Sequence, residues 1–128
     1  MKLEHIGIWV EDLEIMRAFY MKYFNMECSD LYTNEKKGFS SYFLSWNNGT
    51  RLEIMHQSDV MKHPPVRLKW IGYTHIAISL GSKKAVIELT ERLRNDGYGV
   101  AGEPRITGDG YFESVILDPE ENRVELLA

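Results

Sequence analysis

The chain has little cysteine, no excess of positive charge and no long apolar run. Its 128 residues include one cysteine and carry a formal net charge of −4. A lone cysteine excludes an internal disulfide, and the negative balance argues against a partner such as nucleic acid or a membrane surface. Without a transmembrane run or a secretory leader, we expect a cytoplasmic protein in which Cys28 is an inert thiol.

The residues that are present suffice for a packed domain. Hydrophobic residues make up 44% of the chain and aromatic residues 12%. At this length such a composition supports one domain, residues 1–128, that folds without a structural metal.

Two similar apolar segments, each with one histidine, organise the sequence. Residues Leu3–Val10 read LEHIGIWV and residues Gly72–Leu80 read GYTHIAISL. Because side chains alternate between the faces of a strand, each histidine shares a face with the small residue two positions on, opposite the isoleucines. A repeated histidine on a repeated open face indicates a site at His5 and His75.

Each of these segments is followed by an amphipathic helix and then by further strands. Asp12 and Ser82 are the expected N-caps, and Asn95-Asp96-Gly97 is the expected end of the second helix. Asn47-Asn48-Gly49 and the Asp118–Asn122 segment supply turn chemistry. The expected later strands are 31–33, 38–46, 50–55, 99–105, 111–118 and 123–128.

The end of each half is repeated as well. RLEI at Arg51–Ile54 is matched by RVEL at Arg123–Leu126. Both halves therefore read strand, helix, then three strands, and one such unit alone would leave its sheet uncovered. We expect an α+β fold in which two βαβββ modules, about 1–56 and 72–128, pair to form a cupped, mostly antiparallel sheet. Residues 57–71 form the connection, and His56 and His63 beside or within it are expected to be solvated.

The repeats bring forward four residues of metal-ligand type: His5, Glu53, His75 and Glu125. A single histidine in a strand is more often a hydrogen-bonded core residue, but four at matching places favour a site. Two imidazoles and two carboxylates suit Zn, Ni, Co, Mn or Fe. We expect one divalent ion per site, with open positions for a substrate that offers two neighbouring oxygens.

The same segments resemble the vicinal oxygen chelate superfamily, which comprises the glyoxalase I, bleomycin-resistance and extradiol-dioxygenase group. The resemblance covers nearly the whole chain, is closest to bacterial glyoxalase I, and is most specific in DPEENRVEL near the end. It implies that His5, Glu53, His75 and Glu125 are metal ligands, with Ni or Zn favoured.

A glyoxalase I, or lactoylglutathione lyase, activity is what this resemblance implies. Such a carbon–sulfur lyase converts the hemithioacetal of methylglyoxal and a thiol to a 2-hydroxyacyl thioester through a metal-bound enediolate. The implied catalytic residues are Glu125 as the base and Glu53 as its counterpart.

One departure from the family pattern concerns the substrate. Trp9 stands where the glutathione-dependent bacterial enzymes have an arginine, so another thiol is possible. Trp9 and Tyr111 are candidate substrate-binding residues, Tyr111 with a core role as the alternative. Arg51 and Arg123 are candidates for binding a substrate anion, although a surface ion pair is favoured for both.

The resemblance also implies a homodimer in which one chain supplies His5 and Glu53 and its mate supplies His75 and Glu125. Closure within one chain is the alternative. Two other functions stay open: a drug-binding protein of the bleomycin-resistance type, with or without metal, and an enzyme like methylmalonyl-CoA epimerase. Glu53 disfavours the epimerase, which generally has glutamine there.

Overall fold

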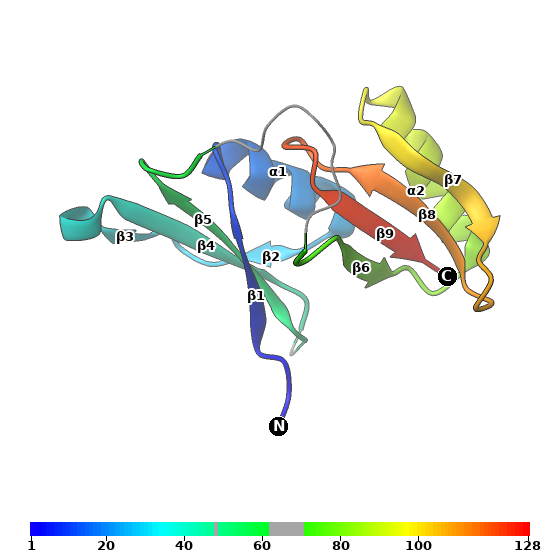
Figure 1. Ribbon diagram of the computed structural model, residues 1–128, viewed down its shortest axis with the longest axis horizontal. Helices are drawn as coiled ribbons and strands as arrows, with labels where there is room; N and C mark the ends of the chain where they lie inside the picture. Colours follow the sequence, from blue (N-terminus) through cyan, green and yellow to red (C-terminus); the bar gives the residue numbers. More distant parts are fainter. Residues whose placement is uncertain (48, 62–70) are drawn as a thin grey trace. The chain divides into compact units, whose positions relative to one another are not determined.

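A computed structural model describes residues 1–47, 49–61 and 71–128 of the chain. The chain divides into two compact units, residues 1–65 and 66–128. Each unit contains an α-helix and a mixed sheet (Figure 1). The predicted α+β class is therefore confirmed, whereas the pairing of the two modules into one cupped sheet stays a prediction.

The first unit has the sheet order β1-β5-β4-β2, and β3 also pairs with β4. Strands β1 and β5 are parallel, and the other pairs are antiparallel. Two short strands, β2 and β3, stand where one was predicted. The elements are β1 His5–Trp9, α1 Leu13–Phe24, β2 Glu27–Cys28, β3 Tyr32–Asn34, the 3₁₀ turn η1 Glu35–Lys37, β4 Phe39–Ser45 and β5 Arg51–Gln57.

The second unit repeats this topology with the sheet order β6-β9-β8-β7. Its first and last strands, β6 and β9, are again the parallel pair. Register shifts interrupt the pairing of β7 with β8. The elements are β6 Ile76–Ser79, α2 Lys83–Asn95, β7 Val100–Ile106, β8 Phe112–Leu117 and β9 Arg123–Leu127.

Both helices begin at the residues that the sequence predicts. The side chain of Asp12 accepts hydrogen bonds from the backbone N–H groups of Glu14 and Ile15, each at 2.9 Å. The Ser82 hydroxyl accepts one from the Ala85 N–H at 3.2 Å. These bonds satisfy donors that have no partner within the first turn of a helix.

The helices cover one face of each sheet, and their apolar stripes form the two cores. In the first unit the helix packs over Leu44, Leu52 and Ile54, and in the second over Ile116, Val124 and Leu126, all of them buried. Side chains one position along each strand point to the opposite side, which we call the open face of each sheet. His5 and Glu53 lie on the first open face, and Glu125 lies on the second.

Two boundary predictions are wrong in detail. Strand β5 continues through His56 to Gln57, because both residues pair with β4. His56 is therefore half-buried, and its Nδ1 lies 3.0 Å from the Val10 carbonyl oxygen. His75 lies just before β6 rather than within it. His63 and Asn48 fall outside the described residues.

The predicted turn before β9 is confirmed, and a buried carboxylate holds it. Asp118 is 3% exposed and accepts hydrogen bonds from the backbone N–H groups of Glu120 and Asn122 at 3.0 and 2.9 Å. Because Asp118 satisfies these turn donors, it fixes where β9 begins and thus where Glu125 stands.

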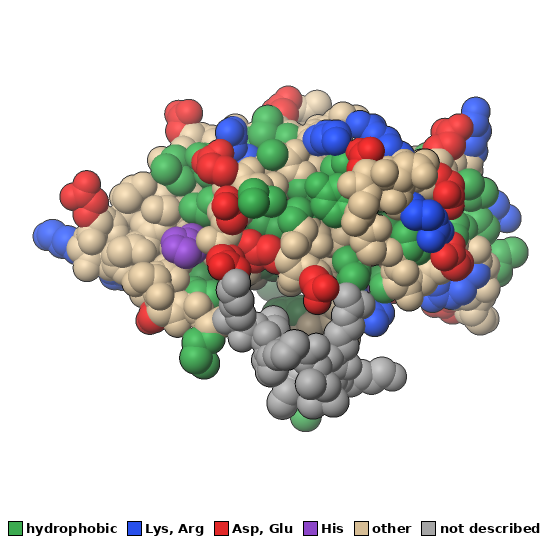
Figure 2. Space-filling model, turned by 90° about the horizontal axis from the view of Figure 1, so that it is seen from above, with side chains coloured by type: hydrophobic (Ala, Val, Ile, Leu, Met, Phe, Trp, Pro, Cys, Tyr) green, Lys and Arg blue, Asp and Glu red, His purple; other side chains and the backbone are tan. Residues whose placement is uncertain are grey.

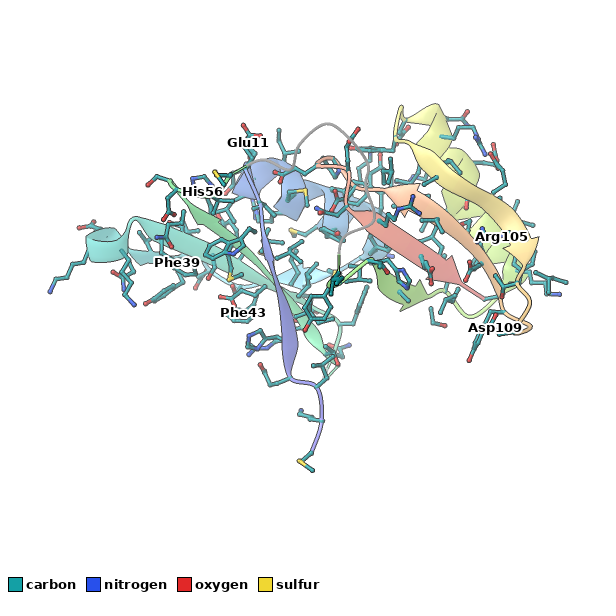
Figure 3. The ribbon with its side chains drawn as sticks, in the orientation of Figure 1. Glu11, Phe39, Phe43, His56, Arg105 and Asp109 are labelled. Atoms are coloured by element: carbon teal, nitrogen blue, oxygen red, sulfur yellow. The ribbon has the colours of Figure 1, made fainter. Side chains whose placement is uncertain are left out.

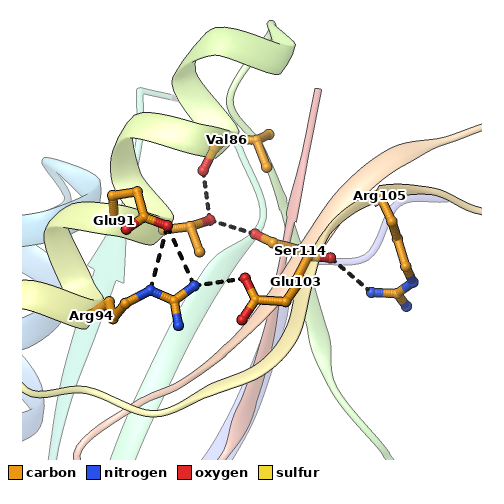
Figure 4. Close-up of polar contacts among 7 residues, drawn as sticks. Val86, Glu91, Arg94, Glu103, Arg105 and Ser114 are labelled. Carbon is orange, nitrogen blue, oxygen red and sulfur yellow. Dashed lines mark hydrogen bonds and ion pairs between the residues drawn. The ribbon is translucent and has the colours of Figure 1, made fainter.

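A pair of buried hydroxyls joins α2 to its sheet. Thr90, on α2, donates to the Val86 carbonyl oxygen at 2.6 Å and lies 2.7 Å from the Ser114 hydroxyl (Figure 4). Both residues are fully buried. Because Thr90 donates to Val86, the buried Ser114 hydroxyl donates to Thr90 and depends on it as a partner.

We expect Thr90→Val to lower the free energy of unfolding by about 1–2 kcal/mol, because Ser114 loses its buried partner. Adding Ser114→Ala removes the hydroxyl that is left without a partner. The double variant should therefore lose less free energy of unfolding than the sum of the losses in the two single variants. Urea unfolding of the four proteins measures the coupling, and strictly additive losses would contradict the shared bond.

Candidate functional site

The parallel pairing of β1 with β5 brings His5 and Glu53 together on the first open face. Gly7 is paired with Glu53, so His5 lies two residues before this position on the neighbouring strand. The His5 Nε2 atom is 3.7 Å from Glu53 Oε2. A side chain larger than hydrogen does not fit at Gly7, since a Cβ there would lie 2.9 Å from the Met55 methyl carbon.

The second unit repeats the arrangement. Ala77 is paired with Glu125, and His75 lies two residues before Ala77. The His75 Nε2 atom is 3.3 Å from Glu125 Oε2. The side chains of Glu125 and Glu53 are 19% and 15% exposed, whereas those of the histidines in the same pairs are two to three times as exposed, at 39% and 41%.

In both pairs the other ring nitrogen is held by the preceding side chain. His5 Nδ1 bonds to the Glu4 carboxylate, and His75 Nδ1 lies 2.9 Å from the Thr74 hydroxyl. The hydrogen bond from His5, with a further contribution from Arg51, lowers the pKa of Glu4. Glu4 therefore stays ionised and only accepts hydrogen bonds, so His5 Nδ1 carries the proton.

This orientation suits metal binding. With Nδ1 protonated, the Nε2 lone pair of a neutral His5 points at a carboxylate oxygen, and two acceptors attract each other only through a cation between them. A proton or a divalent ion meets that need, and imidazole with carboxylate is a ligand set that borderline divalent ions accept. The donor chemistry of both pairs therefore fits the implied metal.

The structure brings the four predicted ligands together only as two pairs, one in each unit. Within residues 1–47, 49–61 and 71–128, no three His, Cys, Asp or Glu side chains converge into a metal-binding group. A single four-ligand centre made of His5, Glu53, His75 and Glu125 remains a prediction.

Aromatic side chains line the open face beyond the first pair. Trp9 is 49% exposed, and its ring contacts that of Phe39 edge-to-face at 6.1 Å. The Tyr32 ring also contacts that of Phe39 at 6.1 Å, and the Phe43 ring contacts that of His5 at 5.5 Å. Figure 3 shows Phe39 and Phe43 along β4. Sequence analysis found Trp9 and missed the other three, because only the pairing of β1 with β5, of β5 with β4 and of β4 with β3 shows that they share its face.

The other predicted substrate residues lie as follows. Arg51 is ion-paired with Glu4 at 2.5 Å and stacks over Phe43 at 4.1 Å, which agrees with the favoured surface ion pair. Arg123 is exposed on β9 and has no ion pair with the described residues. Tyr111 is 57% exposed and not a core aromatic. These positions do not test substrate binding.

Acidic and basic side chains are interspersed on the face shown in Figure 2. Neither helix of the described chain has the length and hydropathy to span a bilayer.

Comparison with known proteins identifies the family. The family model for the Glyoxalase/Bleomycin resistance protein/Dioxygenase superfamily matches residues 2–126. The chain belongs to this superfamily. That match confirms the resemblance seen in the sequence, because it covers both histidine segments and the strands that carry Glu53 and Glu125.

Related proteins agree with this placement. An uncharacterized protein of Bacillus subtilis, YqjT, is 30% identical over 98% of both chains. The trypanothione-dependent glyoxalase I of Leishmania major has a TM-score of 0.79 at 24% identity, covering 99% of this chain and 86% of that one. A glyoxalase family protein of Enterococcus faecalis has a TM-score of 0.80 at 19% identity, covering 99% and 97%. The two structures establish the superfamily fold.

The protonation of His5 can be tested without metal. We expect long-range ¹H–¹⁵N spectra at alkaline pH to show the Nδ1–H tautomer for His5, and Glu4→Ala to reduce its population because the carboxylate acceptor is lost. Thr74→Val serves as the control and should change only His75. An unchanged His5 signal in Glu4→Ala would contradict the assigned tautomer.

Proposed function

We propose that the protein is a metal-dependent lyase of the glyoxalase I kind. Its substrate is the hemithioacetal of an α-oxoaldehyde, such as methylglyoxal, and a thiol, and its product is a 2-hydroxyacyl thioester. The observation that carries the proposal is the repeated pair, in which Nε2 of His5 or His75 faces a carboxylate oxygen at 3.7 or 3.3 Å. Superfamily membership supports the reaction class.

His5, Glu53, His75 and Glu125 would hold one divalent ion, with Ni or Zn favoured. A bound ion supplies a Lewis acid that stabilises negative charge on oxygens next to the reacting carbons. Glu4 and Thr74 fix the histidine rings, so the Nε2 atoms keep their direction. Such supporting partners typically change metal affinity about 10–100-fold.

Glu125 is the proposed base. Isomerisation requires one group to take a proton from the carbon bearing sulfur and to return it to the adjacent carbon, and a carboxylate next to both suffices. Glu125 is the more closely paired of the two glutamates with its histidine, and Glu53 is its counterpart on the other unit. The partial burial of both side chains limits competition from water.

Trp9 and its aromatic neighbours are the proposed apolar part of the substrate site. The exposed indole offers a stacking surface and one N–H donor in place of a cation. A glutathione carboxylate therefore finds no arginine here, and Arg51 is already engaged by Glu4. The thiol is accordingly proposed to be bound elsewhere or to differ from glutathione.

The activity is tested by mixing methylglyoxal with several cellular thiols and following thioester absorbance with Ni- or Zn-loaded protein. We expect turnover that Glu125→Gln lowers at least about a hundredfold, because amide nitrogen cannot accept the proton. His56→Gln is the matched control, since His56 Nδ1 lies 3.0 Å from the Val10 carbonyl oxygen and its side chain lies on the face of β5 opposite Glu53. If the protein binds no stoichiometric Ni or Zn when these ions are supplied, the lyase proposal fails and a metal-free binding function is favoured instead.

We propose further that the functional unit is a homodimer with shared sites. Each unit supplies only one histidine and one glutamate, so a site with all four ligands needs two units. A twofold axis makes two equal sites from His5 and Glu53 of one chain with His75 and Glu125 of its mate.

Mixing two inactive variants distinguishes shared sites from closure within one chain. His5→Gln and His75→Gln each remove a ligand from every site of their own homodimer. After subunit exchange, half of the dimers are mixed and carry one intact site, so about a quarter of the wild-type activity should return. No recovery, with exchange verified by mass spectrometry, would show that each site is built within one chain.

A further inference from the structure

An arginine and a buried glutamate lie on the second open face outside the four predicted ligands. Glu113, on β8, is 8% exposed although it is charged. Arg105, on β7, is its register partner and donates to its carboxylate from Nη2 at 2.8 Å. Figure 3 shows Arg105 on β7. A buried carboxylate needs such a partner, so Glu113 holds the guanidinium in one place.

Strand register puts this pair beside Glu125. Val115 is paired with Glu125 across β8 and β9, and Glu113 is two residues from Val115 on the same face. Gly102 is the partner of Val115 on the far side, in β7. Gly102, Val115 and Glu125 therefore form one row across three strands on the open face.

The guanidinium of Arg105 reaches back into this row. A Cβ built on Gly102 would lie 2.7 Å from Arg105 Nη1, so the arginine occupies the space that a side chain would fill. A long contact of 3.4 Å joins the same nitrogen to the Glu103 carbonyl oxygen (Figure 4). With strands spaced about 4.8 Å apart, the cation stands roughly 10 Å from Glu125 along the row.

The cation remains available to a ligand. The Arg105 side chain is 47% exposed, and its two contacts use two of the five N–H donors of a guanidinium. A guanidinium already fixed by a carboxylate loses little freedom when it binds a second anion. This arrangement differs from Arg94, whose guanidinium bridges Glu91 and Glu103 on the helix side of β7.

We propose that Arg105 is a specificity-determining residue that binds a carboxylate on the thiol part of the substrate, with Glu113 as its positioning residue. The proposal rests on the proposed lyase activity and assigns the anion site to the second unit, whereas Trp9 belongs to the first. The distance from Glu125 fits a thiol whose carboxylate is several bonds from sulfur, which allows the reacting carbons and the anion to be held together.

The test compares paired thiols in the metal-loaded homodimer. Hemithioacetals of methylglyoxal with mercaptopropionate and mercaptohexanoate are matched with those of mercaptopropanol and mercaptohexanol. We expect Arg105→Gln to lower kcat/KM for the mercaptohexanoate adduct about ten- to hundredfold. It should leave the alcohols unchanged, and also the mercaptopropionate adduct, whose carboxylate is too close to sulfur to reach the guanidinium. Arg105→Lys keeps the positive charge but lacks the planar guanidinium, so its kcat/KM for the carboxylate substrate should lie between those of the wild type and Arg105→Gln. Arg94→Gln should behave as wild type.

Equal loss for carboxylate and alcohol substrates, or no loss for either, would overturn the proposal. A second measurement does not depend on turnover: titration of ¹⁵N-labelled protein with the S-methyl thioether of mercaptohexanoate. Shifts at the amides of Gly102, Glu103, Arg105, Ile106 and Glu113 that disappear in Arg105→Gln support the site even if no hemithioacetal is converted. Absence of these shifts in the wild type overturns it, whereas absence of turnover alone refutes only the lyase.

Discussion

The parallel pairing of the first strand of each unit with its last strand is the constraint on which the candidate site depends. It sets His5 diagonally across from Glu53, and it sets His75 in the same relation to Glu125. Parallel neighbours require a crossover, which here consists of the helix and the antiparallel strands. Each unit thus places one imidazole and one carboxylate on the face that its helix leaves open.

Several contacts elsewhere in the structure hold these paired strands and their histidines in position. The Asp118 turn sets the start of β9, and the hydroxyl pair of Thr90 and Ser114 fixes the helix over β8. Glu4 and Thr74 fix the ring orientations. These contacts hold the strands and the two histidine rings in place. The proposed metal site requires this, since a ligand atom misplaced by about an ångström no longer meets the geometry that a metal demands.

Several elements followed from local chemistry. Some features depend only on side chains within a few residues of one another, so the sequence predicts them. They are the N-caps Asp12 and Ser82, the buried strand face with Leu52 and Ile54, and the turn at Asp118. Glu113 carried the same signal as Glu53, an acid inside an apolar strand, and it was missed because no second copy marks it. Tyr32, Phe39 and Phe43 carried no signal, because their common face depends on pairing between strands.

The sequence by itself determined the α+β class, the internal repeat, the superfamily and the four residues of ligand type, because each is written in local periodicity or in a repeated motif. Only the tertiary structure decided which atoms face one another. It directed the Nε2 atoms of His5 and His75 toward the carboxylates, engaged Arg51 with Glu4, and laid Arg105 across Gly102. These outcomes arise from strand register and side-chain packing, which join residues far apart in the chain and leave no local pattern.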